Sequence, residues 1–176
     1  RSVIRRYGIA DLRAGRTPEP VFEFGVDDHI GAIAVARDQG LLFGASWDTE
    51  SVYVWDFEGR LRETKAPDEL RALGLGIDRR ADRTGLAVQD WKVVRGELFA
   101  SGLLPRDAPD SPIVRSRLLI FPNRLAAPHD VRAIELPPGP GVELGREGMA
   151  VADGFLHFIP SDLGPANQYF RIPFVK

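Results

Sequence analysis

One sequence pattern occurs three times in the chain, and this repetition limits the possible folds more than any other feature. Each copy contains a strand of small or β-branched residues, a tight turn that ends in glycine, and a strand of larger apolar residues. The turn glycines are Gly40, Gly96 and Gly154, which lie 56 and 58 residues apart. Such near-constant spacing is typical of folds that stack one structural repeat on the next.

Each repeat continues with a third strand, at Val52–Asp56, Arg117–Phe121 or Gln168–Pro173, and the first two repeats add a fourth. These segments are short, rich in β-branched and aromatic residues, and bounded by turn-forming residues. Four antiparallel strands per repeat form the blade of a β-propeller. The pattern therefore predicts an all-β propeller, and a β-sandwich with accidental spacing is the alternative.

The repeats divide the chain into parts of one propeller fragment. Residues 1–26 would form the outer strands of a preceding blade, residues 27–66 and 84–137 two blades, and residues 144–176 a three-stranded last blade. A short helix is expected at Asp68–Leu73. Propellers usually close with four to eight blades, so we expect the C-terminal half of a six-bladed ring. The missing N-terminal half, or another subunit, would complete that ring.

Composition excludes several classes of function. The chain has no cysteine, which excludes disulfides and thiolate chemistry. Its net charge of −2 comes from both signs mixed along the chain, so no basic face for nucleic acid is expected. No apolar run approaches the roughly 18 residues needed to span a bilayer. The chain begins without Met or a signal peptide, so we expect a fragment or processed chain, and a cytoplasmic or exported location stays open.

The starts of the innermost strands are the first candidates for a ligand site, because propellers bind ligands at the mouth of the central channel. Counting back seven residues from Gly96 and Gly154 gives Gln89 and Glu147, and the longer first turn moves the equivalent place in the first repeat to Gly31, two residues after His29. A polar pair lies at or near each of these places. The candidates at the channel mouth are Asp28 and His29, Gln89 and Asp90, and Arg146 and Glu147. Ordinary polarity of a water-filled channel is the alternative interpretation.

Three of these side chains suit a metal ion. Glu147, Asp90 and His29 together offer the oxygen and nitrogen ligands of a divalent cation such as calcium. The same groups are suited to general acid–base work. Arg146 is suited to holding a carboxylate or phosphate.

A second set of candidates follows the second strand of a repeat. Asp48 and Asp162 each lie eight residues after a turn glycine, and Trp47 precedes Asp48. Aspartates at such places commonly cap a turn, but these loops would also ring the ligand face. Trp47 is the tryptophan best suited to stacking on a ligand, whereas Trp55 and Trp91 are expected to pack between sheets.

The order of several short motifs resembles a bacterial family of predicted six-bladed propellers that is catalogued as a domain of unknown function. The motifs are Asp27–Ile33, Leu42–Trp47, Tyr53–Asp56 and Gln89–Trp91. The likeness runs from about Val21 to the C-terminus and implies a fold without a reaction. The chain departs from the family pattern at Val88, where a tyrosine is expected.

The Glu-Gly-Met-Ala sequence at Glu147–Ala150 is similar to lactonase-type propellers, in which a glutamate at the start of an inner strand binds calcium. This likeness implies Glu147 as a ligand with Asp90 beside it, although no asparagine occupies a matching position.

Three functions remain as hypotheses. The first is binding of a small polar ligand or a divalent cation at the channel mouth. The second is a metal-dependent hydrolase of the lactonase or esterase type that uses Glu147, Asp90 and His29. The third is a protein-interaction scaffold that uses the blade tops and the loop Pro105–Ser116.

Overall fold

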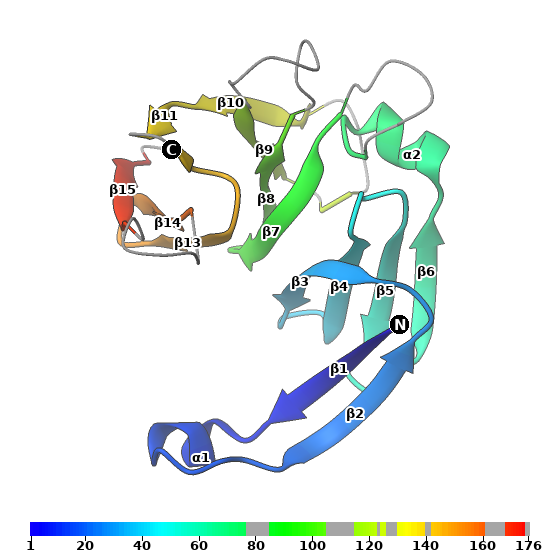
Figure 1. Cartoon of the computed structure of the whole chain (residues 1–176). Helices are drawn as coiled ribbons and strands as arrows, with labels where there is room; N and C mark the ends of the chain where they lie inside the picture. Colours follow the sequence, from blue (N-terminus) through cyan, green and yellow to red (C-terminus); the bar gives the residue numbers. More distant parts are fainter. Residues whose placement is uncertain are drawn as a thin grey trace.

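The strands hydrogen-bond into antiparallel sheets that follow one another along the chain (Figure 1). The computed structural model describes residues 1–76, 85–104, 115–122, 124–125, 130–139, 142–160 and 168–174. Within these residues every pairing between named strands is antiparallel. The all-β class predicted from the sequence is therefore confirmed.

Three sheets each begin with the strand that lies innermost in Figure 1. Sheet 1 consists of β3 (Ile30–Ala36), β4 (Leu41–Ser46), β5 (Val52–Asp56) and β6 (Leu61–Lys65). Sheet 2 consists of β7 (Ala87–Val94), β8 (Glu97–Leu103), β9 (Ser116–Phe121) and β10 (Arg132–Leu136). Sheet 3 consists of β13 (Gly148–Ala152), β14 (Phe155–Ile159) and β15 (Phe170–Pro173).

The remaining elements lie before and between these sheets. A hairpin of β1 (Ser2–Tyr7) and β2 (Pro20–Val26) opens the chain, with α1 (Ile9–Arg13) near its tip. Helix α2 (Pro67–Ala72) follows sheet 1, and the short pair β11 (Pro138–Gly139) and β12 (Val142–Glu143) precedes sheet 3. Neither helix in the described part of the chain is long and apolar enough to cross a membrane.

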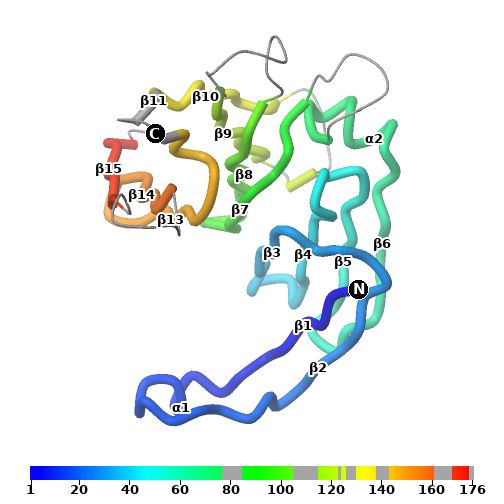
Figure 2. The backbone as a smooth tube through the Cα atoms, in the orientation of Figure 1, coloured from blue at the N-terminus to red at the C-terminus, as the bar shows by residue number. Residues whose placement is uncertain are grey.

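The sheets stand side by side in an open arc, with β3, β7 and β13 turned toward its middle (Figure 1). The backbone trace follows the same arc and shows the β1–β2 hairpin extending from one end (Figure 2). Strand β7 contacts both β3 and β13. Each sheet therefore packs on its neighbours in the order of the sequence.

Two apolar clusters fill the spaces between neighbouring sheets. In the first, Ala32, Ala34 and Ala36 of β3 are at most 6% exposed and share a cluster with Trp91 of β7. Phe43 of β4 meets the Trp91 ring edge to face, with ring centroids 6.4 Å apart. The second cluster joins sheets 2 and 3.

The turn glycines that defined the repeat lie in the conformation that glycine favours. Gly40, Gly96 and Gly154 have φ values of 67°, 84° and 75°. Residues other than glycine rarely adopt this left-handed backbone conformation. The β7–β8 turn and the β13–β14 turn each contain two residues, and the first of these, Arg95 or Asp153, also has a positive φ.

The expected helix at Asp68–Leu73 is confirmed as α2, whereas α1, β11 and β12 were not expected. Helix α1 has no buried residue, and Ile9 and Leu12 on it are more than half exposed. Without a buried face, it leaves no apolar periodicity in the sequence.

The carboxylate of Asp56 organises the turn between β5 and β6. Its Oδ1 accepts hydrogen bonds from the backbone N–H of Glu58 at 3.0 Å and of Arg60 at 2.9 Å. Its Oδ2 pairs with Arg60 Nε and with Arg62 Nη2, both at 2.7 Å. Desolvation acts to raise the pKa of Asp56, but the hydrogen bonds and charge of Arg60, together with the Glu58 N–H, lower it to about 2.

We expect the Asp56 carboxylate to make stability depend on pH in acid. Because its folded pKa is about 2 and its ordinary value is 3.8, its contribution is complete above about pH 4 and is lost as the pH falls toward 2. The stability advantage of the native chain over Asp56→Asn should shrink across this window in thermal melts. Glu58→Gln, at a 64% exposed side chain nearby, serves as the control. An advantage that is constant with pH would contradict the prediction.

Candidate functional site

The pairing register supports the alignment that was made by counting back from the turn glycines. Sheet 1 has an irregularity between Ile30 and Ala32, at Gly31, and sheet 2 has one between Val88 and Asp90, at Gln89. Gly31 and Gln89 therefore occupy equivalent places. Glu147 lies at the same distance from its own turn, immediately before β13.

Side-chain acceptors at these strand starts link successive parts of the fold. Ser2 Oγ accepts the backbone N–H of Ile30 at 2.9 Å, which joins the β1–β2 hairpin to sheet 1. Thr49 Oγ1 accepts the N–H of Val88 at 2.9 Å, which joins sheet 1 to sheet 2. Polarity at this end of the strands is thus partly a means of satisfying free backbone donors.

Asp90 makes the equivalent link from sheet 2 to sheet 3. Its Oδ2 accepts the N–H of Met149 at 2.8 Å, and its Oδ1 accepts the N–H of Trp91 at 2.8 Å. Lys92 Nζ pairs with the same Oδ1, and the Asp90 side chain is 16% exposed. The geometry thus gives Asp90 a structural task at the sheet junction.

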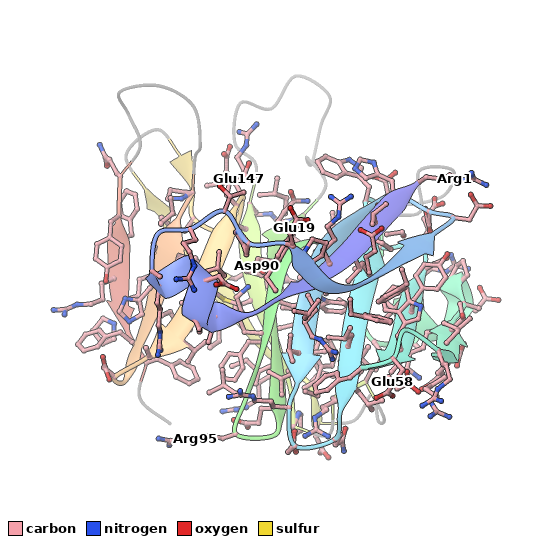
Figure 3. The ribbon with its side chains drawn as sticks, turned by 90° about the horizontal axis from the view of Figure 1, so that it is seen from below. Arg1, Glu19, Glu58, Asp90, Arg95 and Glu147 are labelled. Atoms are coloured by element: carbon pink, nitrogen blue, oxygen red, sulfur yellow. The ribbon has the colours of Figure 1, made fainter. Side chains whose placement is uncertain are left out.

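Figure 3 places Glu147 and Asp90 toward one end of the strands and Arg95 at the other. Glu147 and Gln89 are half-buried, and Arg146 is exposed. Arg146 Nη1 donates to Glu143 Oε2 at 3.2 Å within its own turn. Arg146 is thus tied locally to Glu143 at the start of sheet 3.

The His29 ring lies against the Trp47 ring. The two rings are stacked, with centroids 5.0 Å apart and an interplanar angle of 12°. The backbone N–H of Trp47 also donates to the carbonyl of His29 at 2.9 Å. Trp47 is 52% exposed, whereas Trp55 and Trp91 are 4% and 0% exposed and pack in the core, as expected.

The neighbouring residue Asp28 is hydrogen-bonded to β5 of sheet 1. Its Oδ2 accepts the hydroxyl of Tyr53 at 2.8 Å, and its Oδ1 accepts the N–H of His29 at 2.7 Å. Desolvation and this hydrogen bond to Asp28 raise the pKa of Tyr53. Asp28 therefore holds the chain that precedes β3 and presents His29.

Within the described residues, no group of three or more His, Asp or Glu side chains is placed to hold a metal ion. His29, Asp90 and Glu147 are thus not gathered into a ligand set there. Of the second set of candidates, Asp48 is half-buried after β4, and Asp162 lies outside the described residues, as does most of the loop Pro105–Ser116.

A polar cavity of about 510 Å³ opens beside the start of β3. It is lined by residues of β1 and β3 together with their flanking residues: Arg1, Ser2, Val3, Ile4, Arg5, His29, Ile30, Gly31, Ala32 and Ile33. Among the described residues that line it, the charged ones are Arg1 and Arg5, and His29 also lines the cavity. Sequence reasoning found His29 but missed both arginines, because the docking of the β1–β2 hairpin leaves no local pattern.

The chain matches no family model and no curated protein. The family resemblance drawn from its motifs therefore stays a prediction.

Proposed function

We propose that the chain is part of a β-propeller that binds a small anionic ligand with a flat ring, at the end of sheet 1 where β3 begins. The propeller interpretation is supported by consecutive antiparallel sheets in an open arc and by their matching register. The observation that carries the binding proposal is the exposed His29–Trp47 stack beside the polar cavity.

The charges around the cavity favour an anion. Arg1 Nε pairs with Asp27 at 2.8 Å and Arg5 Nε pairs with Glu23 at 2.9 Å. Each of these pairs uses one nitrogen of a guanidinium that has five N–H donors. Because the partners are exposed, the pairs contribute little to stability, and an incoming carboxylate or phosphate can compete for the same donors.

The flat part of the ligand would lie on Trp47. An exposed indole offers a large apolar face, and stacking on a second ring is favourable. His29 holds this face in place from the other side. The ligand site would thus consist of the exposed Trp47 ring and the arginine-lined cavity, both near the start of β3.

Tryptophan fluorescence tests this proposal directly, because only Trp47 of the three tryptophans is exposed. We expect quenching by one or more members of a panel of aromatic carboxylates, nucleoside monophosphates and sugar phosphates. Trp47→Phe should abolish the signal, and His29→Ala should weaken binding about tenfold, as expected for the loss of a good contact.

The control is His157→Ala, which removes a histidine on β14 that contacts Tyr169 instead. It should leave the affinity unchanged within about twofold. The proposal is overturned if no compound in the panel quenches the fluorescence, or if His157→Ala weakens binding as much as His29→Ala.

A further inference from the structure

Three side chains at equivalent places in the three sheets differ sharply in burial. The fourth residue of the second strand pairs with Ile33 in sheet 1, with Trp91 in sheet 2 and with Met149 in sheet 3. Trp91 is 0% exposed and Met149 is 4% exposed, but Ile33 is 39% exposed. Val35, two residues after Ile33, is 48% exposed.

The preceding sheet accounts for the burial of two of these side chains. Trp91 shares a core cluster with the alanine face of β3 and with Phe43 of β4, so the inner hairpin β3–β4 lies on its side of sheet 2. Met149 shares a cluster with Phe99 of β8, from the inner hairpin β7–β8. Among the described residues, the unit that packs on the Ile33 side of sheet 1 is the β1–β2 hairpin.

A groove of about 460 Å³ lies between that hairpin and sheet 1. Its apolar lining consists of Ile4, Phe22, Phe24, Ile33, Val35, Leu42 and Phe57. Among the described residues, its charged lining consists of Arg5, Arg6 and Arg37. The groove therefore continues the line of the sheet-to-sheet interfaces, at the place where an inner hairpin would pack.

Strand β1 also has an edge that is available for pairing. Among the named strands, β1 pairs with β2 alone. By contrast, β5 and β9, which are the third strands of sheets 1 and 2, each pair with a strand on both sides. A free edge beside an apolar groove is suited to strand addition, in which backbone hydrogen bonds supply affinity and alternate side chains fill the groove.

We propose that this groove binds a β-hairpin of a partner polypeptide, which pairs with the free edge of β1 and places small apolar side chains over Ile33 and Val35. The arginines that line the groove favour an acidic residue in the turn of the bound hairpin. The chain shows such a contact at the next interface, where Asp38 in the turn of β3–β4 pairs with Arg124 after β9. This interface adjoins the proposed ligand cavity and shares Ile4, Arg5 and Ile33 with its lining, but the proposal rests on the apolar groove and on the edge of β1.

The test uses a labelled synthetic peptide with the sequence of residues 30–46, which is the chain's own inner hairpin and carries Asp38 in its turn. Fluorescence anisotropy with the whole chain should show saturable binding of one peptide per chain. Val35→Arg should weaken binding by about tenfold or more, because it places a charge in an apolar contact. Ile33→Gln provides a second variant in the same face.

The matched control is Val21→Arg, which makes the same change on β2 at a side chain that is 64% exposed and does not line the groove. It should alter peptide affinity by less than about twofold. Circular dichroism confirms that each variant is folded.

Three results would overturn the proposal. The first is that no binding is detected with a Kd of about 1 mM or tighter. The second is binding that neither groove variant weakens. The third is concentration-dependent dimerisation that Val35→Arg abolishes, which would assign the face to a second copy. The ligand titration with Trp47 is read separately, so failure of one proposal leaves the other standing.

Discussion

Replacing Trp91 with alanine is expected to lower the free energy of unfolding by about 3–5 kcal/mol. The Trp91 side chain is fully buried between sheets 1 and 2, where it meets Phe43 and the alanine face of β3. The substitution removes this apolar contact and leaves a cavity that the rigid sheets on both sides cannot fill. Urea denaturation followed by circular dichroism measures the change.

Trp47→Ala is the matched control, because it removes the same side chain from a site that is 52% exposed. It should cost less than about 1 kcal/mol. If the two substitutions cost the same, the packing of sheet 1 on sheet 2 described above would be wrong.

Asp90→Ala is expected to cost about 2–3 kcal/mol, the second largest effect. The substitution leaves the N–H groups of Trp91 and Met149 without their carboxylate acceptor at a largely buried junction. Asp90→Asn retains one oxygen acceptor without the charge, so it should fall between Asp90→Ala and the native chain. Hydrogen exchange at the Met149 amide should become faster in the alanine variant.

Asp68→Ala provides the comparison. Asp68 is 91% exposed and its carboxylate is paired with Arg71 on the surface of α2, so the loss should be within about 0.5 kcal/mol. An Asp90→Ala variant as stable as Asp68→Ala would show that the carboxylate does not join the sheets. Unchanged ligand quenching at Trp47 in Asp90→Ala would separate this structural task from binding.

The strands and their register were predictable because their signals are local. Turn glycines such as Gly40 and Gly96 require positive φ, and short runs of β-branched residues end at them. The counting that made Gly31 equivalent to Gln89 agrees with the pairing irregularities of both sheets. Local conformation and alternation are properties that a sequence expresses directly.

The candidate site was predictable only in part, because its partners come from distant elements. His29 was found from its place before β3, but its stacking on Trp47 depends on how the end of β4 returns to that point. Arg5 enters the cavity through the docking of a separate hairpin. Asp90 was grouped with His29 and Glu147 as a candidate metal ligand, which stays a prediction. Its hydrogen bonds to the N–H groups of Trp91 and Met149 were not predicted, because the second of them depends on how sheet 3 docks on sheet 2.

Each sheet is built from consecutive strands and contacts mainly the sheets beside it in the sequence. Chains of this kind follow nearest-neighbour thermodynamics, in which stability is a sum of terms for the units and for the junctions between them. Sheet 2 contributes to both junctions, so ordering is expected to nucleate there and spread outward. Damage at one outer sheet would then stay confined to that end of the molecule.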